Sequence, residues 1–206
     1  MKIATKGIIP RLESACGMTS ARGTSMDRSI TLEQVIHFLL ETPMFEELDA
    51  AELSEIVHIM QVQTFRSGQP IFSEGDHGDS WYVLFRGTAE VTKSAPFGPS
   101  RSVAELSGHA CFGEMAILDG TARSATVSAT DDTTVFRFPR VPFTQLLEFG
   151  NLGAFKLVHG MARILCQRQR RLTQQVSDLM QEVEEERRPE LRRDLGDLLD
   201  TYAVSE

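Results

Sequence analysis

The spacing of apolar residues changes twice along the chain and divides it into a helical start, a strand-rich middle and a helical end. Two short segments near the start carry apolar residues three and four positions apart, which predicts amphipathic helices. The first covers residues 31–41, with Thr31 able to cap it and Pro43 stopping it. The second is predicted to begin at Leu48 or Asp49.

The middle of the chain consists of short β-branched and aromatic segments separated by glycine turns, a pattern typical of strands. The predicted strands are residues 62–65, 70–72, 80–86, 89–93, 101–106, 125–129 and 133–139. Strands at this spacing favour a closed barrel or a jelly roll, with a pocket between its sheets. The predicted fold class is therefore α+β, mainly β.

The helical period returns after Pro142 and predicts two C-terminal helices. The first covers residues 143–149, and the second runs from Leu152 to about Arg188, where Pro189 ends it. The long helix has an apolar line with partial heptad spacing, formed by Leu165, Leu172, Val176, Leu179 and Val183. This line favours a partner helix, and hence a possible homodimer; the alternative is docking on the chain's own N-terminal helices.

These stretches predict one domain with two tails, which suits a chain of 206 residues. Residues 1–29 lack periodicity and are expected to form a disordered tail. The domain covers residues 30–188, and the charged end forms a second tail at residues 189–206. Within the domain we expect N-terminal helices at 30–61, the barrel at 62–140 and C-terminal helices at 141–188.

Composition narrows the function classes. The chain is 41% hydrophobic and 24% charged, and no apolar run approaches the roughly 20 residues that span a bilayer. The start of the chain also lacks a signal-peptide core. Three distant cysteines, Cys16, Cys111 and Cys166, fit a reducing compartment, so we expect a cytoplasmic protein with no membrane partner.

Charge and side-chain spacing exclude further classes. A net charge of −8 argues against general binding of nucleic acid. The sequence contains no Cys-x-x-Cys and no His-x-His, so we expect no metal site.

The candidate chemistry lies in residues 112–127, FGEMAILDGTARSATV. Gly113 lets the backbone approach a ligand closely, and the amides of Met115 and Ala116 open a helical turn toward an anion. Arg123 can meet phosphate oxygens with parallel donors. Glu114 is an acceptor and needs donors, such as a ribose hydroxyl. The segment therefore suits a small anion that carries a sugar.

The remaining candidates are weaker, and every candidate has an ordinary structural alternative. Ser124 can donate its hydroxyl to a phosphate oxygen, to a purine edge or within a turn, and Ala125 is expected to line the pocket from a strand. Outside this context, Arg123 would be a surface ion-pair residue. Glu114 would be an ordinary charge at a helix start.

Residues 112–127 resemble the phosphate-binding cassette of the cyclic nucleotide-binding domain family, without a gap. Upstream, residues 74–83 (EGDHGDSWYV) resemble the Glu-Gly-Asp-x-Gly-Asp segment of the same family, and Gly87 fits its following strand. The resemblance spans about residues 31–172. The one clear departure is Ala122, where the family usually has proline.

The resemblance implies a jelly-roll receptor that binds cAMP or cGMP without altering it. Arg123, Ser124 and the amides near Met115 and Ala116 would hold the phosphate, and Glu114 the ribose 2′-hydroxyl. Ligand binding would reposition the C-terminal helices toward an unknown effector protein or a dimer mate.

Other functions are less well supported. Residues 181–206 are too few for the winged helix that DNA-binding members carry, so we expect no DNA partner. No catalytic constellation is present, and we expect no enzyme activity. The alternative function is a non-enzymatic interaction or assembly module, whose barrel holds nucleotide structurally or not at all.

Overall fold

The computed structural model describes residues 30–95 and 97–203, with side chains described as far as residue 183 in the last helix. The chain divides into two units, residues 1–161 and residues 162–206, and each is considered by itself. The tail predicted at residues 1–29 lies outside the described residues. Among the described helices, none is long and apolar enough to cross a bilayer.

The first helix, α1 (Leu32–Glu41), begins as its sequence predicts. The Thr31 side chain accepts a hydrogen bond from the Gln34 amide at 3.2 Å, and the Gln34 side chain accepts one from the Thr31 amide at 3.0 Å. This reciprocal pair satisfies amides that have no partner inside the helix. The helix ends before Pro43, which opens the 3-10 helix η2 (Pro43–Phe45).

The second helix, α2 (Ala50–His58), has the same kind of start. Its N-cap is Asp49, whose carboxylate accepts hydrogen bonds from the amides of Ala51 and Glu52 at 2.8 and 2.9 Å. Glu52 in turn accepts from the Asp49 amide at 2.8 Å. The predicted boundary at Leu48 or Asp49 therefore lies within two residues of the observed one.

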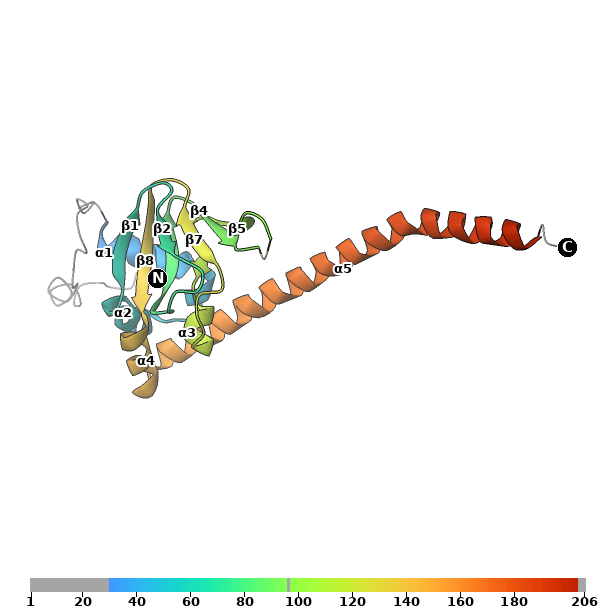
Figure 1. Cartoon of the computed structure of the whole chain (residues 1–206). Coiled ribbons are helices and arrows are strands. Elements are labelled where there is room, and N and C mark those ends of the chain that lie inside the picture. The colour runs from blue at the N-terminus through green and yellow to red at the C-terminus, as the bar shows by residue number, and fades with distance from the viewer. Residues whose placement is uncertain (1–29, 96, 204–206) are drawn as a thin grey trace. The chain divides into compact units, whose positions relative to one another are not determined.

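Two four-stranded antiparallel sheets follow, and together they form the predicted jelly roll (Figure 1). The first sheet has the order β1 (Gln61–Phe65), β8 (Thr133–Pro139), β3 (Ser80–Arg86), β6 (Cys111–Phe112). The second has the order β2 (Pro70–Phe72), β7 (Thr126–Ala129), β4 (Ala89–Lys93), β5 (Arg101–Leu106). Neighbouring strands are thus often far apart in sequence, and the sheets bring together segments that carry the candidate site.

Most strands lie where the sequence predicts them. Strand β6 was not predicted, because its two residues are too short to show an alternating pattern. Strand β7 begins at Thr126, so Ala125 lies just outside it.

The core of the domain is aromatic. The Trp81 ring stacks on Phe138 with centroids 4.1 Å apart, and Phe143 meets it edge-on at 5.9 Å. All three side chains are at most 1% exposed. They come from β3, β8 and α4 (Arg140–Glu148), so the barrel and its first C-terminal helix share one core.

The last helix, α5 (Leu152–Ala203), corrects the prediction that Pro189 ends it. A proline inside a helix removes one hydrogen bond and costs about 3 kcal/mol, but it does not always break the helix. The residues around Pro189 are mostly Glu, Arg and Leu, which favour helix. The segment predicted as a tail at 189–206 is therefore helical as far as Ala203.

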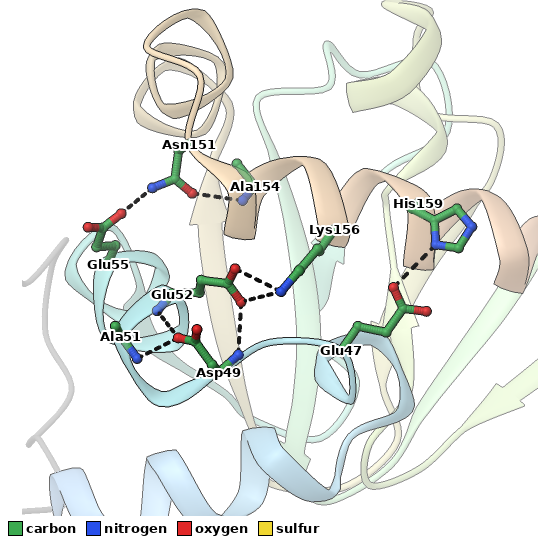
Figure 2. A network of polar contacts seen from close by, with 9 residues as sticks. All are labelled: Glu47, Asp49, Ala51, Glu52, Glu55, Asn151, Ala154, Lys156 and His159. Atoms are coloured by element: carbon green, nitrogen blue, oxygen red, sulfur yellow. Dashed lines mark hydrogen bonds and ion pairs between the residues drawn. The ribbon is translucent and has the colours of Figure 1, made fainter.

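Polar contacts hold the first turns of α5 against α2, within the unit of residues 1–161 (Figure 2). The Lys156 ammonium lies 2.8 Å from both carboxylate oxygens of Glu52. Asn151 donates to Glu55 and accepts from the Ala154 amide. Because Glu52 also belongs to the α2 cap, the helix start and the ion pair form one network.

We expect Asp49→Ala to raise the unfolding equilibrium constant about five-fold, because the change removes the N-cap acceptor. Asp49→Asn keeps an acceptor and should retain most of that stability. Urea denaturation of the two variants checks this. Equal losses in both variants would show that charge, and not capping, is what Asp49 supplies.

The same cap predicts a pH dependence. Hydrogen bonds from the amides of Glu52 and Ala51 lower the pKa of Asp49 from its ordinary value of 3.8, despite the opposing effect of desolvation. Its stabilisation is therefore complete above pH 3.8 and is lost as the pH falls through the lower folded-state pKa. The stability difference between wild type and Asp49→Ala should narrow below pH 3.8.

Candidate functional site

The candidate site is built on the turn between β6 and the short helix α3 (Met115–Asp119). Gly113 has a φ of 75°, in the left-handed region that favours glycine. A Cβ at this position would also lie 2.7 Å from Nη1 of Arg123. The glycine is therefore needed both for the turn and for the close approach of the guanidinium, a contact that the sequence motif does not reveal.

The Arg123 side chain is 4% exposed and lies among backbone carbonyls. Nη1 donates to the Gly113 carbonyl at 2.8 Å, and Nη2 donates to the Ser80 carbonyl at 2.6 Å. The guanidinium carbon lies 4.2 Å from the ring centroid of Phe72, a cation–π distance. Arg123 thus connects β2, β3 and the cassette turn.

These contacts leave part of the guanidinium without a partner. Nε of Arg123 is buried and has no hydrogen-bond partner within the described residues. The carboxylate oxygen Oδ1 of Asp79 is 3.6 Å from Nη2. Burial lowers the pKa of Arg123 from its ordinary value, and the charge of Asp79 opposes this effect. A buried cation with a free donor favours an added anion.

Asp79 is shared between two arginines. Its carboxylate accepts from Arg137 at 2.8 Å and from the Ser80 hydroxyl at 2.9 Å. Burial alone would raise the pKa of Asp79, but the Ser80 hydrogen bond and the Arg137 charge outweigh it and keep the pKa below its ordinary value. The single negative charge of Asp79 is therefore shared between Arg123 and Arg137.

Backbone hydrogen bonds hold Ala122 and Arg123 of the cassette against the connection between β2 and β3. The Arg123 amide donates to the Asp76 carbonyl at 2.9 Å, and the Gly75 amide donates to the Arg123 carbonyl at 2.9 Å. Ala122 forms an isolated antiparallel bridge with His77. These contacts hold the backbone of residues 122 and 123 in place although Ala122 replaces the proline that the family usually has.

The upstream glycine motif also supports the cassette. A Cβ on Gly78 would lie 2.3 Å from the Cβ of Ala116, which is itself 3% exposed in α3. No side chain at position 78 fits unless α3 moves. Gly78 therefore sets the distance between α3 and the start of β3.

The other predicted site residues differ in their exposure. Glu114 precedes α3 and is 2% exposed, whereas Met115 is 46% exposed. The first hydrogen bonds of α3 run from the amides of Ile117 and Leu118 to the Glu114 carbonyl. The amides of Met115 and Ala116 precede those donors, at the end of the helix where the prediction places an anion.

Ser124 is exposed and Ala125 is half-buried. The Ser124 carbonyl accepts from the Lys93 ammonium at 2.6 Å, and Lys93 also pairs with Glu74 at 2.5 Å. This pair and the Ser94 amide lower the pKa of Glu74 to about 2. The residues on both sides of Arg123 are therefore held by contacts: Ala122 by its bridge with His77, and Ser124 by Lys93.

Sequence reasoning missed the residues that hold Arg123. Asp79 and Ser80 lie in the upstream motif of residues 74–83, so the sequence did single out that segment. The motif does not show that the Ser80 carbonyl points toward Arg123. Phe72 carried no signal beyond its strand pattern. An open depression of about 630 Å³ lies instead on α1 and the end of β3, and its lining includes no predicted site residue.

Comparison with known proteins agrees with this geometry. Residues 62–148 match the family model described as the cyclic nucleotide-binding domain. The matched residues have the sequence pattern and the fold of a cyclic nucleotide-binding domain. The match runs from the second residue of β1 to the end of α4 and includes the whole cassette, so the resemblance in the sequence is confirmed.

Similar proteins contain this domain as one part of a longer chain. A cAMP-dependent protein kinase regulatory subunit of Mycosarcoma maydis is 36% identical over 53% of this chain and 22% of its own length. Glutaminase 1 of Bradyrhizobium diazoefficiens is 34% identical over 71% of this chain and 22% of its own length. The chain therefore spans less than a quarter of these two relatives.

The fold is also found in solved structures. The crystal structure of the Thermus thermophilus catabolite activator protein superposes with a TM-score of 0.59 and 28% identity. The superposition covers 66% of this chain and 62% of that protein.

We expect Gly78→Ala to lower the free energy of unfolding by about 1–3 kcal/mol, because the added methyl group overlaps Ala116. Gly108→Ala is the matched control, since nothing lies within 4 Å of a Cβ there. Its effect should stay within about 0.5 kcal/mol. Denaturant unfolding measures both, and equal effects would contradict the packing of α3 on β3.

Proposed function

We propose that this domain is a receptor for a cyclic purine mononucleotide, cAMP or cGMP, which it binds without altering. The supporting observation is the buried Nε donor of Arg123, which has no hydrogen-bond partner within the described residues. A cyclic phosphodiester is a single negative charge at neutral pH, and it can accept this donor. The name of the kinase regulatory subunit favours cAMP as the first ligand to test.

The proposal gives each cassette residue a role. Arg123 pairs with the phosphate, and the amides of Met115 and Ala116 and the Ser124 hydroxyl share its charge. Glu114 accepts a hydrogen bond from the ribose 2′-hydroxyl. Gly113 and Ala125 also contact the ligand: Gly113 allows the backbone to approach, and Ala125 lines the site.

Binding becomes a signal only if the ligand prefers one arrangement of the domain. We propose that this arrangement concerns α4 and α5, which follow the barrel directly in sequence. The recipient is an effector protein, not yet identified, or a second copy of the chain bound through α5. We expect the protein to act in the cytoplasm.

The alternative proposal is an assembly module that holds nucleotide structurally or not at all. Extraction of the purified protein and mass spectrometry of the released nucleotides separate a tightly held ligand from an exchangeable one. An enzyme that degrades the ligand is a third possibility, and incubation with cAMP followed by chromatography tests it. Intact cAMP is the outcome expected of a receptor.

We expect Arg123→Lys to weaken cAMP binding by about 1–3 kcal/mol, or roughly 5- to 150-fold. Lysine keeps the charge but loses the planar donors and the stacking on Phe72. Lysine also preserves part of the structural role of Arg123, whereas Arg123→Ala removes all of it. Calorimetric titration measures the change, with the exposed Arg66→Lys as control. Unchanged affinity in a folded Arg123→Lys protein would refute the site.

We expect Glu114→Ala to weaken cAMP binding by about 1–3 kcal/mol, because it removes an acceptor for the ribose. The same substitution should hardly change binding of 2′-deoxy-cAMP, which lacks the hydroxyl. Calorimetric titration of both ligands into the wild type and the variant gives the coupling energy between Glu114 and the 2′-hydroxyl. Equal losses for the two ligands would mean that Glu114 only maintains the cassette.

A further inference from the structure

A second positive charge lies beside the cassette, outside both sequence motifs. The Lys93 ammonium, at the end of β4, donates to the Ser124 carbonyl at 2.6 Å and to Oε1 of Glu74 at 2.5 Å. Ser124 directly follows Arg123 in the chain. The ammonium therefore lies next to the stretch of backbone that carries the buried guanidinium.

The alternation of side chains along β4 directs Lys93 toward the interior side of the barrel. Ala89 is fully buried in the barrel core, and Val91 packs against the same cluster of residues. Side chains two positions apart lie on one face of a strand, so Lys93 shares this face. Its side chain is 50% exposed, which places the ammonium at the rim of the interior and not in the closed core.

A neighbouring arginine adds to this charge. Arg101 on β5 is the direct register partner of Lys93 across the two strands. Like charges that face each other in this way destabilise a strand pair. Among the described residues, Glu74 is the one carboxylate that forms an ion pair with either of them. The three side chains together keep a net positive charge, which favours a further anion.

Glu74 holds Lys93 in place and opposes its charge. The second carboxylate oxygen of Glu74 accepts from the Ser94 amide at 2.9 Å. The Lys93 hydrogen bond is the largest of the effects that lower the pKa of Glu74 to about 2, so the carboxylate is ionised at neutral pH. Without Lys93, this carboxylate would repel an anion nearby. Without the charge of Glu74, the ammonium would attract that anion more strongly.

The ammonium also keeps a donor for a ligand. Lysine carries three N–H donors, and two of them reach Glu74 and Ser124. The third has no acceptor within the part of the chain that the structure describes. Because the donors of an ammonium rotate freely, this one can turn toward an arriving oxygen.

We propose that Lys93 is a second cation of the nucleotide site, which attracts the phosphate of the ligand by its charge and its free donor, and that Glu74 limits this attraction. The proposal rests on the proposed function, because it concerns the same ligand. It adds a residue from β4 to a site that is otherwise built from the cassette.

The first experiment titrates cAMP into the full chain by calorimetry. Lys93→Met should weaken binding roughly 10-fold, because it removes a cation and leaves Glu74 uncompensated. Lys93→Arg keeps the charge and should stay within about three-fold of the wild type. Arg66→Met removes an exposed cation from the turn after β1 and changes the net charge equally, so it should leave the affinity unchanged.

The second experiment separates charge from structural support. Glu74→Gln should strengthen cAMP binding about three-fold, because it removes a negative charge and keeps an acceptor. If Glu74 and Lys93 only held the backbone, both substitutions would weaken binding. The double variant should bind within about three-fold of the wild type. All of these differences should shrink between about 0.05 and about 0.5 M salt, because salt screens half-exposed charges.

Unchanged affinity in Lys93→Met, or weaker binding in Glu74→Gln, would overturn the proposal. So would differences between the variants that persist at high salt. A wild type that binds neither cAMP nor cGMP would overturn the proposed function and this inference together. A wild type that binds, with variants that bind equally well, would overturn this inference alone.

Discussion

The candidate site depends on a buried guanidinium that keeps one donor, Nε, without a hydrogen-bond partner within the described residues. Arg123 is held by the carbonyls of Gly113 and Ser80 and by the ring of Phe72, so it cannot turn away from the site. Its counter-charge, Asp79, is 3.6 Å away and is shared with Arg137. A fixed cation with a free donor is preorganised for an anion. Folding has already ordered and desolvated the guanidinium, so binding does not have to do so.

Glycine makes this arrangement possible at two places. Gly113 lets the guanidinium approach the cassette turn, and Gly78 lets α3 pack on the start of β3. In both cases the contact joins segments that are distant in sequence. A methyl group at Gly113 would displace Arg123, and one at Gly78 would displace Ala116. The cassette and the upstream glycine motif therefore pack directly against each other, through Ala116 and Gly78.

The proposed signalling route runs through the C-terminal helices, which follow the barrel directly in sequence. The first turns of α5 are tied to α2 by Lys156 and Asn151. Further along the same helix, Leu172, Val176, Leu179 and Val183 are more than half exposed. One continuous helix therefore begins beside the barrel and extends beyond it in sequence to Ala203.

Local signals in the sequence determined much of this protein, because caps, strand alternation and the cassette act over a few residues. Thr31 and Asp49 begin their helices as predicted, and the motif in residues 112–127 is enough to indicate the family. The tertiary structure alone decided the rest. Ser80 meets Arg123 across 43 positions, and β6 forms by pairing with β3. Contacts between distant residues depend on how the sheets close, and no short stretch of sequence contains that information.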